Sequence, residues 1–347
     1  MSKARGYAVL SATAPLTPFA FSRREPRERD VRIEISHCGI CHTDIHQTRN
    51  EWGSSTYPMV PGHEIIGKVS QVGSKVEKFK VGDLAGVGCM VDSCRKCATC
   101  RKGLEQHCEL HTSFTYSNTE QDGKTPTQGG YSSHIVVDEA FALKVSAKLS
   151  LERVAPLLCA GITTYSPLKR WKMGSGNRVG VMGLGGLGHM AVKLAAAMGA
   201  EVTVLSGSKS KAADAKRLGA HEFALTAEAV ESGKLTNRFD LIIDTISADH
   251  DVNGPMSLLK TGGTLVLVGA PPKPLAVASF SLIGGRKNLS GSVIGGIQET
   301  QEMLDFCAKE NVLSDVEVIA IKDVNRAYER MLKNDVRYRF TIDMKTL

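Results

Sequence analysis

The stretch NRVGVMGLGGLGHMAVKLAAAMGAEVTVLS, residues 177–206, contains an apolar run, a glycine-rich turn, a helix-like segment and a second apolar run. The helix-like segment ends at Gly199, and the apolar run EVTVLS follows it. KAADAKRLGA, FDLIIDTI and GGTLVLVGA continue the same alternation toward residue 290. Strand-like runs that alternate with helical segments indicate βαβ units around a parallel sheet. The sequence therefore predicts an α/β fold in this part of the chain.

The turn GLGGLG fits the pattern G-x-G-x-x-G, which gains weight here because it follows an apolar run and opens a helix. In that context Gly183 allows the tight turn, Gly185 admits a pyrophosphate and Gly188 lets helix and strand pack closely. The alternative is an ordinary strand–helix turn. The context favours dinucleotide binding on a Rossmann-type, doubly wound sheet. The residues of this turn are Gly183, Leu184, Gly185, Gly186, Leu187 and Gly188.

The segment LSGSKSK, residues 205–211, follows the second apolar run, where an NAD site usually has an acidic residue for the ribose hydroxyls. It has no carboxylate; Ser206, Ser208 and Lys211 instead offer hydroxyl and ammonium groups to a 2′-phosphate. The alternative is a solvated polar turn. We therefore expect NADP(H) rather than NAD(H).

The rest of the chain has a different texture. Residues 1–150 contain short β-branched runs such as VRIEIS, IIGKVSQVG and YSSHIVVD, separated by Gly and Pro. This predicts a β-rich domain interrupted by functional loops. Near Pro156 the texture changes, and the tail contains a helix-like segment, residues 297–311. The final run VRYRFTIDM, residues 336–344, predicts a strand that rejoins the first domain.

Composition limits the possible partners and compartment. The 347-residue chain has no apolar run near the ~20 residues that span a bilayer, and its start lacks the apolar core of a signal peptide. We therefore expect a cytoplasmic protein with no membrane partner. The formal charge of +7 raises the possibility of a nucleic-acid partner, but basic spots such as FSRREPRERD are interleaved with acids. We expect no nucleic-acid binding.

Four cysteines in VDSCRKCATCRKGLEQHC, residues 91–108, have the spacing C-x2-C-x2-C-x7-C. Four thiolates in one loop complete a tetrahedral zinc shell and leave no place for a substrate. Iron–sulfur binding is an alternative for close cysteines, and disulfides are disfavoured in a reducing compartment. The spacing predicts a structural zinc site formed by Cys94, Cys97, Cys100 and Cys108.

A second set of metal-ligand types is dispersed over CGICHTDIH, GHE and LLCAGITTYSP. Cys41, His63 and Cys159 would give zinc three protein ligands and leave a fourth position for water or substrate. The spacing alone does not establish this site. A histidine in such a turn is more often hydrogen-bonded locally, and a single cysteine is more often a small buried apolar residue.

With these residues in view, the chain resembles the zinc-dependent medium-chain alcohol dehydrogenases, and within them the cinnamyl-alcohol-dehydrogenase branch with its bacterial NADPH-dependent aldehyde reductases. CGICHTDIH, VPGHEIIGKV, the four-cysteine loop, LLCAGITTYSPL, GLGGLGHMAVKLAAAMG and GSVIGG carry the resemblance in the family's order. It implies a GroES-like catalytic domain, residues 1–155 and 296–347, which contains both zinc sites. The inserted NADP-binding Rossmann domain would comprise residues 156–295.

The resemblance also implies roles for individual residues. Cys41, His63 and Cys159 would hold the catalytic zinc, and Glu64 would replace the departing water or substrate as a ligand. Asp44 would accept the far N–H of His63 and orient the ring.

Thr43 and His46 would form a proton relay. Trp52 and Tyr57 are candidates for an apolar substrate pocket or for surface packing. In the cofactor site, Ser206, Ser208 and Lys211 would bind the 2′-phosphate. The residues implied at the nicotinamide end are Thr163, Val268, Ser292 and Ile294.

The function that this resemblance implies is reversible hydride transfer between NADPH and aromatic, unsaturated or medium aliphatic aldehydes, giving primary alcohols. The enzyme would contain two zinc ions per chain and form a homodimer. A zinc-free reductase of the quinone-reductase type is one alternative, and a nucleotide-sensing or nucleic-acid-binding module with a zinc loop is another.

Overall fold

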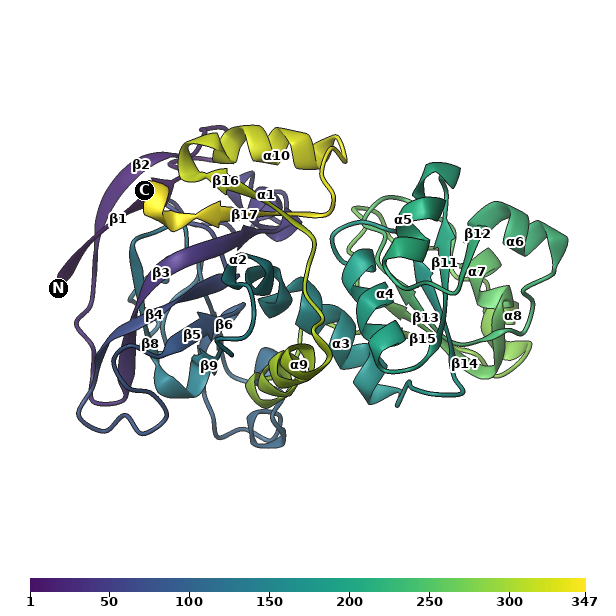
Figure 1. Ribbon diagram of the computed structural model, residues 1–347, viewed down its shortest axis with the longest axis horizontal. Helices are drawn as coiled ribbons and strands as arrows, with labels where there is room; N and C mark the ends of the chain where they lie inside the picture. Colours follow the sequence, from purple (N-terminus) through teal and green to yellow (C-terminus); the bar gives the residue numbers. More distant parts are fainter. The chain divides into compact units, whose positions relative to one another are not determined.

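The computed structural model describes residues 1–347 and divides into two compact units. Unit 1 comprises Met1–Ile162 together with Gly295–Leu347, and unit 2 comprises Thr163–Ile294. In Figure 1, unit 1 contains the purple and blue part of the chain with the yellow C-terminal segment, and unit 2 contains the teal and green part. The segment 156–162, which carries Cys159, packs with unit 1.

Unit 2 is built on a six-stranded parallel sheet with the strand order β12-β11-β10-β13-β14-β15. The chain starts in the middle of the sheet, winds to one edge and returns to build the other half. The crevice where β10 and β13 lie side by side is thus the switch point at which doubly wound folds bind dinucleotides. The strands are β10 (Arg178–Met182), β11 (Glu201–Ser206), β12 (Glu222–Leu225), β13 (Phe239–Asp244), β14 (Leu259–Leu267) and β15 (Asn288–Gly291).

Helices connect these strands, as the alternation in the sequence predicts. Val179, Val181 and residues 241–243 are fully buried, as expected of central strands covered on both faces. The α/β prediction is therefore confirmed. The helices are α3 (Ala160–Arg170), α4 (Gly188–Ala197), η5 (Lys209–Lys211), α5 (Ala212–Arg217), α6 (Thr226–Ser232), α7 (Asn253–Ser257) and α8 (Ser279–Ile283).

Unit 1 is dominated by a seven-stranded sheet in which β16-β17-β3-β4-β5-β9 form a continuous path and β8 pairs with β3. Two small antiparallel pairs, β1–β2 and β6–β7, complete its β structure. The strands are β1 (Ser2–Ala8), β2 (Thr17–Arg23), β3 (Asp30–Ile40), β4 (Ile65–Val72), β5 (Leu84–Val87), β6 (Met90–Ser93), β7 (Thr112–Phe114), β8 (His134–Asp138), β9 (Leu143–Lys144), β16 (Val316–Ala320) and β17 (Arg339–Asp343).

The C-terminal segment rejoins this sheet. Its strand β17 pairs antiparallel with β3, and Figure 1 shows the yellow arrow beside the purple one. The predicted tail helix is present as α9, and the predicted final strand is present as β17. The helices of unit 1 are α1 (His42–Thr48), η1 (Cys100–Lys102), η2 (Glu105–His107), η3 (Glu139–Phe141), α2 (Leu151–Val154), η4 (Ala155–Leu158), α9 (Ile297–Glu310), η6 (Ile321–Asp323), α10 (Val324–Leu332) and η7 (Met344–Thr346).

The pairing of β3, β4 and β17 brings three segments of the chain together at one edge of this sheet. β3 and β4 are antiparallel, with Cys38 opposite Ile65, so the end of β3 lies beside the start of β4. Phe340 of β17 lies opposite Ile40, the last residue of β3. The residues that follow β3, precede β4 and begin β17 therefore meet at one edge.

The helices of both units are too short or too polar to cross a bilayer.

Candidate active site

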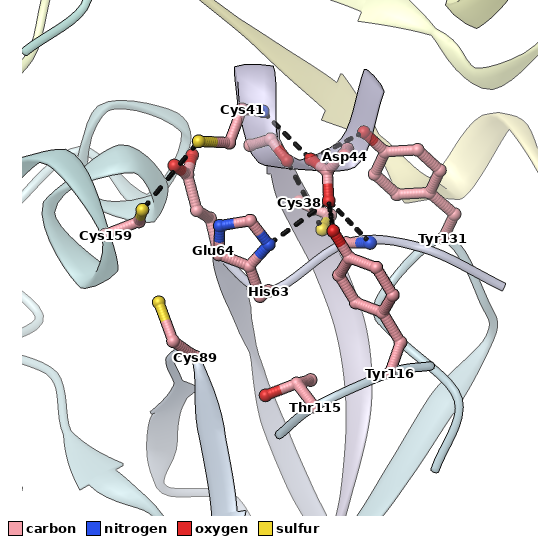
Figure 2. Close-up of polar contacts among 12 residues, drawn as sticks. Cys38, Cys41, Asp44, His63, Glu64, Cys89, Thr115, Tyr116, Tyr131 and Cys159 are labelled. Carbon is pink, nitrogen blue, oxygen red and sulfur yellow. Dashed lines mark hydrogen bonds and ion pairs between the residues drawn. The ribbon is translucent and has the colours of Figure 1, made fainter. Parts of the chain in front are cut away.

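Four side chains from three separate segments converge at this edge of unit 1. Cys41 follows β3, His63 and Glu64 precede β4, and Cys159 follows η4. Their ligand atoms all lie within 4.8 Å of one another, and all four residues are buried. The Cys41 and Cys159 sulfurs are 3.8 Å apart, and Figure 2 shows them facing each other with Glu64 and His63 beside them.

This donor set fits a zinc ion. Two thiolates at about 2.3 Å from a tetrahedral zinc stand about 3.8 Å apart, which matches the Cys41–Cys159 separation. Glu64 Oε2 is buried without a hydrogen-bond partner, so a cation at this position would satisfy it. Burial raises the pKa of Glu64 to about 7, although the positive charge of Arg339 opposes the shift.

Glu64 is held from the side by a residue that the sequence analysis did not identify. Arg339, at the start of β17, donates a hydrogen bond to Glu64 Oε1, and its side chain is only 5% exposed. Gly39 leaves room for this carboxylate, because a Cβ there would lie 1.9 Å from Glu64 Oε2. The signal available in the sequence was an arginine inside the predicted final strand; in the structure Phe340 to Ile342 of that strand are buried and Asp343 is half-buried.

The ring of His63 is hydrogen-bonded to Asp44. The His63 Nδ1 lies 3.1 Å from Asp44 Oδ1, which is fully buried, so Nδ1–H donates and Nε2 is left for a metal. Asp44 lies in the first turn of α1 and also accepts the Cys41 N–H at 2.9 Å. One carboxylate therefore fixes both the backbone of Cys41 and the ring of His63.

Two tyrosines complete the surroundings of Asp44, and the sequence analysis identified neither. The Tyr116 hydroxyl donates to Oδ1 at 2.7 Å, and the Tyr131 hydroxyl donates to Oδ2 at 3.2 Å. Figure 2 shows both rings pointing their hydroxyls at Asp44. Burial raises the pKa of both tyrosines well above the usual range, so both hydroxyls stay protonated and donate.

Thr43 and His46 lie on α1, and both are half-buried. The His46 Nδ1 lies 2.5 Å from Glu51 Oε2, so Nδ1–H donates to this carboxylate and fixes the tautomer. The Trp52 ring stacks on His46 with 5.0 Å between ring centroids and is 49% exposed. Glu51 is a partner of His46 that the sequence analysis did not identify.

Tyr57, the second candidate for an apolar substrate pocket, donates its hydroxyl to the Thr48 carbonyl at 2.9 Å. This hydrogen bond holds Tyr57 against the last residue of α1.

The four-cysteine cluster is formed by the loop between β6 and β7. The sulfurs of Cys94, Cys97, Cys100 and Cys108 lie within 4.8 Å of one another. Hydrogen bonds from the Thr99 hydroxyl and the Cys100 N–H lower the pKa of Cys97 to about 5, which favours the thiolate. Four sulfurs at this spacing fit a closed tetrahedral zinc shell.

The glycine-rich turn of unit 2 has the geometry that a dinucleotide site needs. Gly183 has φ +83°, and a Cβ on Gly188 would lie 2.1 Å from the Gly183 carbonyl oxygen. A Cβ on Gly185 would meet nothing within 4 Å, so open space faces the backbone there. Leu184, Gly186 and Leu187 complete the turn into α4.

The segment after β11 contains the polar groups expected near a 2′-phosphate. Ser206 ends β11, and its hydroxyl accepts the Ser208 N–H at 3.2 Å. Lys211 ends η5, and no acidic residue lies between residues 206 and 211.

The four nicotinamide-end candidates all belong to unit 2. Val268 follows β14 and donates its N–H to the Asp244 carbonyl at 2.9 Å. Ser292 follows β15 and donates its N–H to the Leu267 carbonyl at 3.1 Å. Both thus lie at the carboxyl edge of the sheet. Thr163 and Ile294 are the first and last residues of the unit, and both are buried.

Comparisons with known proteins agree with this architecture. The family of alcohol dehydrogenase GroES-like domains matches residues 27–147, and the zinc-binding dehydrogenase family matches residues 186–309. An NADP-dependent alcohol dehydrogenase C of Mycobacterium tuberculosis is 53% identical over 100% of both chains. An aldehyde reductase of Escherichia coli is 50% identical over 99% of both chains.

Solved structures give the same result. A cinnamyl alcohol dehydrogenase from Sorghum bicolor has a TM-score of 0.95 at 44% identity, covering 99% of this chain and 98% of that one. A cinnamyl alcohol dehydrogenase from Helicobacter pylori, complexed with NADP(H), has a TM-score of 0.92 at 44% identity with the same coverage. Fold and donor sets together define a zinc-binding dehydrogenase. The chain belongs to the zinc-dependent medium-chain alcohol dehydrogenase family, in its cinnamyl-alcohol-dehydrogenase branch.

The buried Arg339–Glu64 pair yields a stability prediction. Arg339→Met should lower the free energy of unfolding by about 3–5 kcal/mol, because it leaves the buried Glu64 carboxylate without its arginine partner. Arg326→Met is the control, since the Arg326 side chain is 72% exposed and its pair with Asp323 should contribute less than about 1 kcal/mol. Denaturant unfolding of the zinc-loaded protein measures both. Equal losses of unfolding free energy in the two variants would show that the buried pair contributes no more to stability than the exposed one.

Proposed function

We propose that this protein is a zinc-dependent, NADP(H)-dependent alcohol dehydrogenase and aldehyde reductase. It would transfer hydride reversibly between NADPH and aromatic, unsaturated or medium aliphatic aldehydes, giving primary alcohols. The observation that carries the proposal is the convergence of Cys41, His63 and Cys159 with Glu64 in one buried cluster. The 50–53% identical relatives named as NADP-dependent alcohol dehydrogenases and an aldehyde reductase support the same reaction.

Unit 1 would be the catalytic domain, and unit 2 the NADP-binding domain. Cys41, His63 and Cys159 would hold the catalytic zinc, with Glu64 as an exchangeable fourth ligand. When bound, the zinc polarises the carbonyl oxygen of the aldehyde and NADPH supplies the hydride. Two thiolates and one neutral imidazole leave this site formally neutral, whereas four thiolates give the cysteine loop a formal charge of −2. The neutral site is therefore the more electrophilic, and the loop is structural.

The protein's own contribution to the proton step would come from α1. The Thr43 hydroxyl would donate a proton to the carbonyl-derived oxygen as the alcohol forms, and the half-buried His46 would replace that proton through the nicotinamide ribose. The hydrogen bond from His46 Nδ1–H to Glu51 fixes the tautomer of the ring, which leaves Nε2 to face the relay. Glu51 thus joins the relay as an orienting group.

In unit 2 the turn Gly183–Gly188 would receive the pyrophosphate, with the open space at Gly185 as the point of backbone approach. Ser206, Ser208 and Lys211 would bind the 2′-phosphate. Thr163, Val268, Ser292 and Ile294 would contact the nicotinamide end.

The proposal includes a cytoplasmic homodimer. Edge strand β15 is free to pair with its counterpart, and the neighbouring Phe280, Ile283 and Val293 are 81%, 66% and 52% exposed. Zinc-binding thiolates suit a reducing compartment, which cell fractionation would identify. Light scattering tests the dimer, whose mass should be twice the 37.3 kDa of one chain.

Loss of one catalytic ligand tests the reaction and the metal together. Cys159→Ser should lower the bound zinc from two ions per chain to one. It should also reduce NADPH-dependent aldehyde reduction by more than ~100-fold, the upper end of what losing an outer-shell partner costs. Cys307→Ser, at a buried cysteine of α9 outside both clusters, should retain both ions and activity. Metal analysis and NADPH oxidation on an aldehyde panel measure this. Near-normal turnover in Cys159→Ser would refute the proposed function.

Cofactor choice has a separate test. Lys211→Ala should raise the KM for NADPH about 10-fold and leave the KM for NADH within about 2-fold, because a hydrogen bond to a charged group contributes about 1.5–3 kcal/mol. Lys216→Ala, on the exposed side of α5, is the matched control. Steady-state kinetics with both cofactors decide the point; an equal rise for NADH would remove Lys211 from the 2′-phosphate site.

A further inference from the structure

The carboxylate of Asp44 accepts hydrogen bonds from five groups. Its Oδ1 accepts from the Gly62 N–H at 3.2 Å, from His63 Nδ1 at 3.1 Å and from the Tyr116 hydroxyl at 2.7 Å. Its Oδ2 accepts from the Cys41 N–H and from the Tyr131 hydroxyl. Because Asp44 is fully buried and forms no ion pair with a lysine or an arginine, these donors are what keep it in place.

Tyr116 differs from the other donors in two ways. Its hydroxyl makes the shortest of the five hydrogen bonds, on the same oxygen that His63 uses. Its ring also lies against the His63 ring, with 5.8 Å between centroids, and both are visible together in Figure 2. Tyr116 therefore touches both the orienting carboxylate and the oriented imidazole.

The chain around Tyr116 connects it to the four-cysteine loop. That loop leaves β6 and returns as β7, and Tyr116 follows β7 by two residues. Between them Thr115 is fixed to the other side of the loop: its N–H donates to the Cys89 carbonyl at 3.1 Å and its hydroxyl donates to the Gly88 carbonyl at 2.6 Å. The segment that closes the loop thus also carries the tyrosine.

We propose that Tyr116, in the segment that follows the four-cysteine loop, is a positioning residue for the catalytic metal site, acting on His63 through Asp44. This inference rests on the proposed function, because it presumes that His63 holds the catalytic zinc. The physical reason is that a carboxylate with three donors on one oxygen has one orientation. Without the Tyr116 hydroxyl, Oδ1 keeps two longer hydrogen bonds, and His63 is held less firmly toward the ion.

The test compares the release of the two zinc ions from the full-length, zinc-loaded protein to a chromogenic chelator. Tyr116→Phe removes one hydroxyl and keeps the ring. It should release the catalytic zinc about 10-fold faster, the lower end of the effect of an outer-shell partner. Release of the structural zinc should not change. With Co²⁺ in the catalytic site, the visible absorption bands of Tyr116→Phe should shift as well.

Two matched variants separate positioning from loosening of the fold. Thr115→Val removes the neighbouring buried hydroxyl of the same segment without touching Asp44, so it should lower stability but leave catalytic-zinc release unchanged. Tyr328→Phe removes a hydroxyl that lies 3.5 Å from the Tyr131 hydroxyl and does not contact Asp44. It should also leave the release rate of the catalytic zinc unchanged.

The outcomes distinguish this inference from the proposed function. Two zinc ions in the wild type with unchanged release and an unchanged cobalt spectrum in Tyr116→Phe would overturn the inference alone. Equal acceleration in Tyr116→Phe and Thr115→Val, or faster loss of both zinc ions, would also overturn it by showing general loosening. A wild type that binds only the structural zinc would overturn both proposals.

Discussion

Two carboxylates buried at one sheet edge are the constraint on which the site of this protein depends. Asp44 and Glu64 are both fully buried, and an unpaired buried charge costs several kcal/mol. The fold compensates each in a different way: five hydrogen-bond donors surround Asp44, and Arg339 pairs with Glu64. Each compensation needs β3, β4 or β17 in its observed register. The metal site and the strand pairing therefore stabilise each other.

Both cysteine-containing clusters offer thiolate ligands to zinc, but they differ in how far apart their ligands lie in the sequence. The four-cysteine loop draws all its ligands from one short stretch, so a local chain fold is enough to assemble it. The other cluster takes its four candidate ligands from three separate segments, so it forms only when the fold brings these segments together. The loop ends in β7, and Tyr116 beyond β7 contacts Asp44. The segment that follows the cysteine loop thus reaches the surroundings of the second cluster.

In unit 2 the candidate cofactor site depends mainly on backbone geometry rather than on distant side chains. The glycine turn needs Gly188 for close packing and Gly183 for its positive φ, whereas Gly185 faces open space. These three glycines are neighbours in the sequence, within one strand, turn and helix, so their geometry depends on the local chain alone. For that reason the α/β class, the position of the turn and the missing acidic residue after β11 could all be read from the sequence.

The sequence by itself determined the local features: the parallel sheet, the glycine turn, the tail helix and final strand, and the types and spacing of the candidate metal ligands. Only the tertiary structure decided which distant side chains meet. Cys41, His63, Glu64 and Cys159 form one cluster because the end of β3 lies beside the start of β4, and η4 packs against both strands. Arg339, Glu51, Tyr116 and Tyr131 could not be assigned beforehand, since their roles depend on partners remote in the fold or on side-chain direction. Periodicity and spacing report the chain's own neighbourhood, whereas hydrogen bonds to a buried carboxylate depend on how strands far apart in sequence pair.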